Sequence, residues 1–270
     1  MEGVTRGVAF AAVVLALIGG AVALILGAGD DPGPRTGTTA ESRPQPETTV
    51  ADDLKPTRAG RAGAERELVL AKHGNPLVWV KRGEKVDIHA APGGTVVETV
   101  GAETEFGSRT VLSVAQVEGE WAGVPSPFTG NGALGWVRLD GRYLESGYTS
   151  LEIVVDISER RTQLFRDGEA IKTFTVSVGA PGTDTPTGRF AVTDTFRGDL
   201  NPAYGCCAVA LTAVQPNLPS GWLGGNRIAI HGTSGPLGAA VSSGCVRAAD
   251  RDVSALVEEV PPGVPVTIRQ

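Results

Sequence analysis

Short apolar runs separated by turn-forming residues recur through most of this chain, and they limit what it can fold into. Between residues 68 and 148 the breaks contain glycine and proline, and no helical periodicity persists. The same pattern continues from residue 151, where Asp167-Gly168 between two apolar runs is a strong hairpin signal. The pattern predicts a mainly β protein. The predicted strands are residues 77–81, 86–89, 95–100, 110–117, 135–139, 151–156, 163–166, 171–178, 187–194, 208–212, 227–230 and 264–268.

One short helix is expected close to the last predicted strand. Asp250 is its predicted N-cap, and Pro261-Pro262 would stop it. The apolar stripe that would face the core consists of Val253, Leu256, Val257 and Val260. A β-rich domain with a single short helix is therefore predicted for residues 150–270.

Length and charge narrow the class of protein. The chain has 270 residues, which favours about two folded domains, and 41% of its residues are apolar. The net charge is −6 and the pI is about 5.2, so no nucleic-acid-binding surface is expected. We expect a membrane anchor with a short cytoplasmic end over residues 1–29, a disordered linker over 30–65, and folded domains over 66–148 and 150–270.

Residues 7–29 form an apolar stretch without charges. At about 1.5 Å per residue, this stretch is long enough to cross a bilayer. A cleaved signal peptide is the alternative, since Ala21-Val22-Ala23 could mimic a cleavage site, but the apolar run continues past it. We therefore predict an uncleaved transmembrane helix. Arg6 before it and Asp30-Asp31 after it favour a cytoplasmic N-terminus.

The linker and the middle domain differ in composition. Residues 30–65 are rich in proline, threonine, glycine, alanine and charge, and bury too little apolar surface to order themselves. Residues 66–148 are expected to form a small β-barrel. The segments 86–89, 92–93, 119–121 and 135–137 make it similar to bacterial SH3-like domains, which often bind wall material or position a neighbouring catalytic unit.

The three cysteines are unevenly placed. Cys206 and Cys207 are adjacent, and Cys245 stands apart from them. No CxxC spacing occurs, so no zinc site is predicted, and no other metal or cofactor is expected. A bridge from either neighbour to Cys245 would remove a thiol nucleophile. We therefore expect three free thiols, with Cys206 and Cys207 in structural roles.

A histidine and a cysteine occur fourteen positions apart in a glycine-bearing context. Residues 230–233 read Ile-His-Gly-Thr, and residues 242–247 read Ser-Ser-Gly-Cys-Val-Arg. A thiol becomes a strong nucleophile only when a base removes its proton, and an imidazole is suited to that task. Flanking glycines let backbone N–H groups approach a reacting carbonyl. The pattern indicates acyl transfer through a thioester.

This ordered set of motifs resembles the active-site pattern of the YkuD-type L,D-transpeptidases, which cross-link bacterial peptidoglycan. The likeness extends to residues 151–156, 161–168 and 173–179, to the Thr-Pro-Thr-Gly-Arg-Phe turn of residues 185–190, and to residues 201–205 beside the active site. It covers about residues 151–269. Together with the transmembrane helix predicted from residues 7–29, it implies an envelope enzyme with its catalytic domain outside the cytoplasm. It also implies peptidoglycan stem peptides as substrates, and carbapenem-type β-lactams as possible inhibitors.

Residue roles follow from the resemblance. It implies that Cys245 is the nucleophile, that His231 is its base, and that the carbonyl of Gly232 orients the imidazole. The oxyanion hole would be formed by the backbone N–H groups of Ser243, Gly244 and Cys245. Arg247 matches the motif arginine, which would hold a stem-peptide carboxylate or brace the loop. Many family members have histidine where this chain has Ser243, which affects the fine positioning of the substrate.

Two other functions stay open from the sequence. In an L,D-carboxypeptidase, water would resolve the same thioester, and acceptor choice cannot be read from these motifs. A non-catalytic wall-binding protein would use the SH3-like domain and the linker, but has no need for an intact Cys/His pair. Papain-like and NlpC-type peptidases fit less well, because there the cysteine precedes the histidine in sequence.

Overall fold

The computed structural model describes residues 55–56, 70, 73–198, 200–218, 220 and 225–270. The predicted transmembrane anchor and nearly all of the predicted linker lie outside these residues. Within the described part of the chain, no helix has both the length and the apolar character to cross a membrane. Two described residues of the predicted linker, Lys55–Pro56, form the short strand β1, which pairs antiparallel with β9 at Tyr148 and Gly147.

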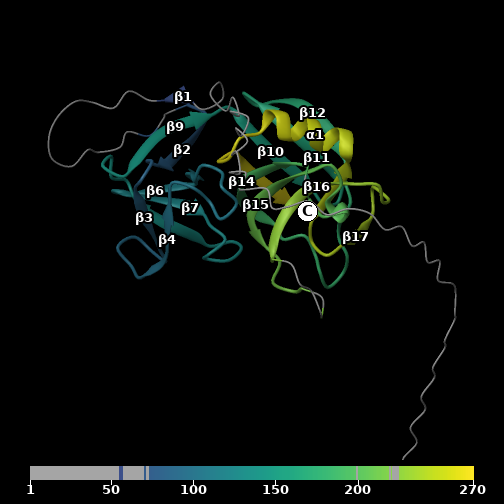
Figure 1. Ribbon diagram of the computed structural model, residues 1–270, viewed down its shortest axis with the longest axis horizontal. Helices are drawn as coiled ribbons and strands as arrows, with labels where there is room; N and C mark the ends of the chain where they lie inside the picture. Colours follow the sequence, from purple (N-terminus) through teal and green to yellow (C-terminus); the bar gives the residue numbers. More distant parts are fainter. Residues whose placement is uncertain (1–54, 57–69, 71–72, 199, 219, 221–224) are drawn as a thin grey trace, which may run out of the picture. The chain divides into compact units, whose positions relative to one another are not determined.

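The middle region is built from two antiparallel sheets (Figure 1). One has the order β1-β9-β2-β5 and the other β4-β3-β8-β7-β6. Val78, Ile88, Val124 and Val137 are fully or almost fully buried in the core of this region. Besides β1, the strands are β2 (Asn75–Val80), β3 (Lys85–His89), β4 (Val96–Gly101), β5 (Val111–Ser113), β6 (Gln116–Glu118), β7 (Trp121–Pro125), β8 (Leu134–Arg138) and β9 (Leu144–Thr149).

The sequence predicted only some of the strands of this region. The single strand predicted over residues 110–117 is divided into β5 and β6, which belong to different sheets. Strands β7 and β9 were missed, because each contains a glycine that interrupts its apolar pattern. In β7 that glycine has a packing reason: a Cβ on Gly123 would lie 2.9 Å from Leu134 and 3.2 Å from Trp136. The SH3-like character of this region stays a prediction.

The second region contains an eight-stranded sheet of order β12-β11-β10-β19-β14-β15-β16-β18. Neighbours are antiparallel except for β10 with β19 and β16 with β18, which are parallel. A separate parallel pair joins β13 to β17. The strands are β10 (Leu151–Asp156), β11 (Arg161–Arg166), β12 (Glu169–Thr175), β13 (Val178–Gly179), β14 (Gly188–Arg197), β15 (Cys207–Val214), β16 (Arg227–Thr233), β17 (Ala240–Ser242), β18 (Val246–Ala249) and β19 (Pro265–Arg269).

The hairpin predicted at Asp167-Gly168 is confirmed. Strand β11 pairs with β12, and Arg166 lies opposite Glu169 across a two-residue turn. Both turn residues have positive φ, 51° at Asp167 and 83° at Gly168. A two-residue turn of this kind matches the twist of the flanking strands.

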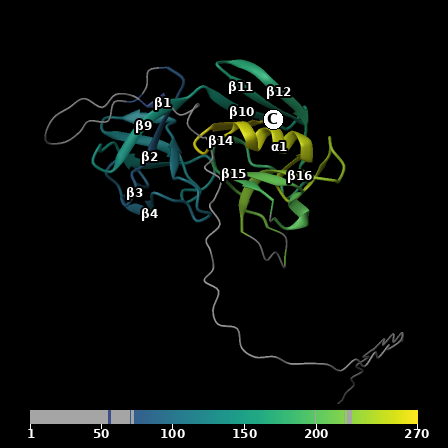
Figure 2. The same ribbon diagram turned by 45° about the horizontal axis from the view of Figure 1, so that its top comes forward.

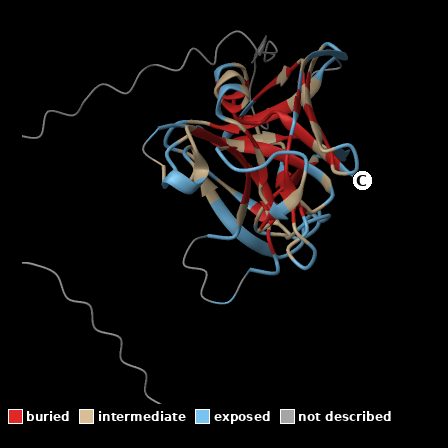
Figure 3. Ribbon diagram, turned by 90° about the vertical axis from the view of Figure 1, so that its right-hand side faces the viewer, coloured by how far each residue is buried: buried red, intermediate tan, exposed pale blue. Residues whose placement is uncertain are grey.

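The predicted helix is present as α1 (Asp250–Glu259), and it contacts β14, β15, β16 and β18 (Figure 2). Its buried residues are Val253, Leu256 and Val257, as the stripe predicts. The predicted cap is wrong: Ala249 is the N-cap, and Asp250 is the first helical residue. The Asp250 carboxylate accepts a hydrogen bond from the Cys206 N–H instead, which couples the helix to the chain before β15. Figure 3 shows buried residues concentrated along the strands, whereas exposed residues dominate many loops.

Candidate active site

The two parallel strands β16 and β18 bring the predicted reactive residues together. His231 on β16 lies directly opposite Arg247 on β18 in the strand register. Cys245 immediately precedes β18, which is the strand next to β16 and the last strand of the sheet on that side. On the other side of β16, Ala208 of β15 pairs with His231. The sheet topology therefore unites two motifs that are separate in sequence.

His231 is buried, with 3% of its surface exposed. Its Nδ1 lies 2.8 Å from the carbonyl oxygen of Gly232. A carbonyl only accepts hydrogen bonds, so this contact places the proton on Nδ1 and leaves Nε2 unprotonated in the neutral ring. Residue 232 has no room for a side chain, because a Cβ there would lie 2.1 Å from Asp250 Oδ1. The backbone carbonyl is the orienting group this position supplies.

The surroundings keep both the histidine and the cysteine neutral. Burial lowers the pKa of His231, and the positive charge of Arg247 adds to this, against the raising effect of the Gly232 and Tyr204 carbonyls. Burial raises the pKa of Cys245, and this outweighs a hydrogen bond to the Ala229 backbone and the charge of Arg247. Both shifts favour the neutral form of the group, the imidazole of His231 and the thiol of Cys245, at neutral pH.

Tyr204 is a site residue that sequence reasoning did not single out. It ends the 3-10 helix Pro202–Tyr204, and its ring meets that of His231 edge to face, with centroids 4.9 Å apart. Burial raises the pKa of the Tyr204 hydroxyl, and the charge of the Cys245 thiolate raises it further. Tyr204 therefore lies close to both reactive groups. The only signal in the sequence was its place in the segment of residues 201–205.

Residues 242–245, which we call the cysteine loop, form a tight turn closed by the side chain of Ser242. The Ser242 hydroxyl donates to the carbonyl of Cys245 at 2.6 Å and accepts from the Gly244 N–H at 3.1 Å. The Gly244 N–H, one of the three predicted oxyanion donors, is therefore engaged within the loop. Ser243 and Cys245 donate their N–H groups to no other described residue. These two groups are the donors open to a ligand.

Two buried polar side chains donate hydrogen bonds to backbone carbonyls of the cysteine loop, and neither contact was predicted. The Thr185 hydroxyl accepts from the Gly179 N–H and donates to the Gly244 carbonyl, each at 2.8 Å. Gln215 Nε2 donates to the carbonyls of Ser243 at 3.3 Å and Asp184 at 3.1 Å. Thr185 begins the Thr-Pro-Thr-Gly turn noted in the sequence, but its contact with the loop is long-range. Gln215 carried no signal.

Replacing Thr185 with valine is expected to lower the free energy of unfolding by about 2 kcal/mol, because it leaves a buried N–H and a buried carbonyl without their partner. It should also slow the reaction of Cys245, since the loop loses the hydrogen bond that holds the Gly244 carbonyl. Chemical denaturation and the rate of thiol acylation measure the two effects. Thr187→Val is the matched control, because that threonine is exposed. Equal stability of the two variants would contradict the anchoring role.

Arg247 is held by its backbone and not by its side chain. Its N–H and carbonyl exchange hydrogen bonds with Ser177, both at 2.8 Å. Its Nε atom is buried without a hydrogen-bond partner among the described residues. The guanidinium is nevertheless close enough to influence the pKa values of both His231 and Cys245. It is therefore a cation at the site with hydrogen-bonding capacity to spare.

The expectation of three free thiols is wrong for two of them. Cys206 and Cys207 form a disulfide with each other, and Cys245 is the free cysteine of the described chain. The expectation considered only bridges to Cys245. In the structure both sulfur atoms lie on the same side of the chain, near the Asp250 carbonyl at 3.2 Å and 4.0 Å. Among the described residues, no group of three or more His, Cys, Asp or Glu could hold a metal ion.

Comparisons with known proteins agree with the motif-based prediction. Residues 150–268 match the family model YkuD, described as the L,D-transpeptidase catalytic domain. The matched residues coincide with the segment in which the motifs predicted a catalytic domain. Two curated relatives are both described as putative L,D-transpeptidase YkuD. The one from Bacillus subtilis is 32% identical over 120 residues, and the one from Bacillus licheniformis is 33% identical over 118 residues.

These matches cover only part of each protein. The aligned residues make up 44% and 43% of this chain, and 65% and 64% of the two relatives. Among solved structures, an L,D-transpeptidase from Mycobacterium tuberculosis H37Rv is similar, with 18% identity and a TM-score of 0.37. That match covers 51% of this chain and 72% of the other.

Proposed function

We propose that this protein is a peptidoglycan L,D-transpeptidase that forms cross-links through a thioester on Cys245. One observation carries the proposal. In a domain that matches the YkuD model, His231 has its Nδ1 fixed by the Gly232 carbonyl, on the strand next to the one that Cys245 precedes. The other ring nitrogen is then left to act as a base toward the thiol.

In the proposed reaction, His231 Nε2 takes the Cys245 proton as the sulfur attacks the carbonyl between the third residue of a donor stem and its terminal D-alanine. The negative oxygen is stabilised by the N–H groups of Ser243 and Cys245. The Gly244 N–H joins them if Ser242 releases it. The C–N bond then breaks, and the leaving D-alanine receives its proton from His231. The amine of an acceptor stem attacks the thioester, gives up a proton to His231, and restores the thiol.

Arg247 is proposed to bind a carboxylate of the donor stem. It is a cation beside both reactive residues, and its buried Nε makes no hydrogen bond among the described residues. A guanidinium matches the planar geometry of a carboxylate with two parallel hydrogen bonds. Burial raises the pKa of Cys245, and the charge of Arg247 offsets part of this, so it favours the thiolate as this forms.

The pH dependence of acylation should follow from the neutral resting pair. The acylation rate is expected to rise with pH through a pKa below the ordinary histidine value of about 6.5, because imidazolium cannot accept the thiol proton. It should then stay level through neutral pH, because the raised pKa of Cys245 keeps the thiol protonated. Carbapenem acylation rates measured at a series of pH values test this. A rate that falls as the histidine deprotonates would instead indicate a thiolate–imidazolium pair.

The remaining parts of the chain have proposed roles in the same process. Residues 7–29 would anchor the protein in the membrane of a bacterial envelope, and residues 30–65 would let the folded part reach the wall. The middle region, predicted to be SH3-like, would bind wall material or position the catalytic domain.

The decisive experiment incubates the full chain, in mild detergent because of its apolar N-terminal stretch, with purified disaccharide-tetrapeptide. Products are identified by mass spectrometry, and Cys245→Ala is the background control. Cross-linked dimers with release of D-alanine support the transpeptidase. Trimmed tripeptides without dimers would assign the L,D-carboxypeptidase reaction instead. If neither product forms, and both wild type and Cys245→Ala sediment with insoluble peptidoglycan, the result would favour a non-catalytic wall-binding protein.

A further inference from the structure

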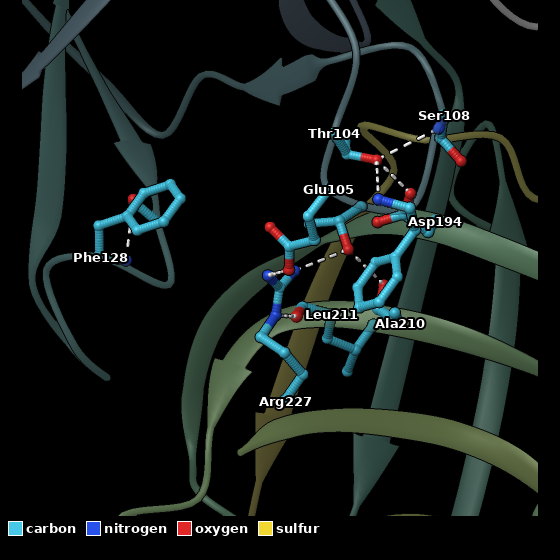
Figure 4. A network of polar contacts seen from close by, with 11 residues as sticks. Thr104, Glu105, Ser108, Phe128, Asp194, Ala210, Leu211 and Arg227 are labelled. Atoms are coloured by element: carbon cyan, nitrogen blue, oxygen red, sulfur yellow. Dashed lines mark hydrogen bonds and ion pairs between the residues drawn. The ribbon is translucent and has the colours of Figure 1, made fainter. Parts of the chain in front are cut away.

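A cavity of about 320 Å³ lies between the middle region and the sheet of the catalytic region. From the catalytic region it is lined by residues of β14, β15 and β16, including Thr193, Asp194 and Arg227. From the middle region its lining includes Thr110 and Phe128. In Figure 4, Phe128 lies across from the polar network around Arg227. Neither Cys245 nor His231 lines this cavity, so it is a different site from the proposed active site.

The lining of the cavity is negatively charged. It contains four carboxylates and one cationic side chain, Arg227. Arg227 is already engaged: it donates to Glu105 Oε1 at 2.8 Å, to the Leu211 carbonyl at 2.9 Å and to Thr193 Oγ1 at 2.8 Å. Its ion pair is with Glu105, and among the described residues it forms none with Asp194. The carboxylates of the lining are Glu98, Glu103, Glu105 and Asp194.

Asp194 is the unusual member of this set, because only 1% of its surface is exposed. One of its oxygens accepts a hydrogen bond from the Thr104 hydroxyl at 2.5 Å (Figure 4). The other, Oδ2, is buried and has no partner among the described residues. The hydroxyl of Thr110, which is also buried, lacks a partner as well. A buried carboxylate oxygen without a donor is costly, so a donor from a ligand would be stabilising here.

The rest of the lining is suited to an aliphatic chain. Val100, Val111, Leu112 and Phe128 contribute apolar surface, and the volume lies at the lower end of the usual range for ligand pockets of about 300–1,000 Å³. A ligand that suits both halves has a positively charged N–H donor at the end of a short apolar stem.

From this combination we infer that the cavity binds an aliphatic primary ammonium, with its nitrogen at Asp194 Oδ2 and its methylene stem against Val100 and Phe128. The side chain of a diamino acid has this chemistry. If the proposed function is correct, the amine-bearing residue of a stem peptide is a natural occupant, and this last step alone rests on that proposal.

The test is calorimetric titration of the full chain in mild detergent with Nα-acetyl-lysine methylamide. The matched ligand is Nα-acetyl-norleucine methylamide, which has the same aliphatic stem without the ammonium. We expect saturable binding of the lysine compound and no binding of the norleucine compound. The affinity for the lysine compound should fall as the salt concentration rises. Asp194→Asn keeps the shape and removes the charge, and should weaken binding by roughly tenfold or more. Glu118→Gln removes a charge on β6 outside the cavity and should bind like wild type.

Equal binding of both ligands, or no binding of either, would overturn the inference, and so would wild-type affinity in Asp194→Asn. If Asp194→Asn does not fold, Phe128→Ala takes its place, because that side chain is partly exposed and its loss should weaken binding without unfolding the core. Cys245→Ala should bind the lysine compound like wild type. The same titration therefore separates failure of this site from failure of the proposed reaction.

Discussion

Replacing His231 with glutamine is expected to slow carbapenem acylation of Cys245 by roughly 100- to 10,000-fold at neutral pH, the range typical of a lost general base. The effect should be large because the thiol is not ionised beforehand: burial raises the pKa of Cys245, so little thiolate exists without a base. Intact-mass spectrometry of the full chain over a time course measures the rate as the appearance of a single adduct.

The pH dependence of this variant distinguishes a chemical role from a structural one. In His231→Gln the acylation rate should climb steadily as pH rises, because the thiolate then forms without help. Wild type should instead show its plateau. Cys245→Ala must give no adduct at any pH, which identifies the labelled residue. If His231→Gln reacts like wild type at neutral pH while remaining folded, the histidine is not the base.

Replacing Gly244 with alanine is expected to destabilise the protein strongly, because the added Cβ has neither a favourable backbone conformation nor free space. Residue 244 has a φ of 112°, which L side chains rarely adopt, and a Cβ there would lie 2.2 Å from Gln215 Nε2 and 3.0 Å from Ile228 Cδ1. We expect a loss of about 2–4 kcal/mol in the free energy of unfolding, from backbone strain and overpacking together. Acylation should also slow, because displacement of Gln215 frees the Ser243 carbonyl that it holds.

A control glycine separates these two causes. Gly182 also has positive φ, at 89°, but nothing lies within 4 Å of the position its Cβ would take. Gly182→Ala should therefore cost only the backbone term, about 1–2 kcal/mol, and leave acylation unchanged. Thermal or chemical unfolding of both variants gives the comparison. Equal losses in the two would show that the contact with Gln215 is unimportant.

The sequence predicted those parts of the fold that local chemistry determines. The Asp167-Gly168 turn needs only two residues that tolerate positive φ between two apolar runs. The helix over residues 250–259 follows from the spacing of Val253, Leu256 and Val257. The position of the segment that matches the YkuD model, residues 150–268, followed from ordered motifs, which need no knowledge of how the strands pair.

What the sequence did not predict depends on contacts between distant segments. Thr185 and Gln215 support the cysteine loop from positions 59 and 28 residues before the backbone groups they bind. Asp250 has the residue type of a helix cap, yet its carboxylate binds the Cys206 N–H. No local pattern encodes any of these arrangements.

The position of β19 has a consequence for how this protein folds. It follows every other strand in sequence order, yet it lies between β10 and β14, with Ile153 opposite Val266 and Phe190 opposite Val266 on the other side. The two halves of the sheet are therefore joined only when β19, the last strand in sequence order, pairs with both β10 and β14. Contacts of such long sequence separation slow folding, because a large loop must close before they can form. The strands that hold His231 and the cysteine loop would meanwhile belong to a half-sheet with an open edge, prone to pairing with other chains.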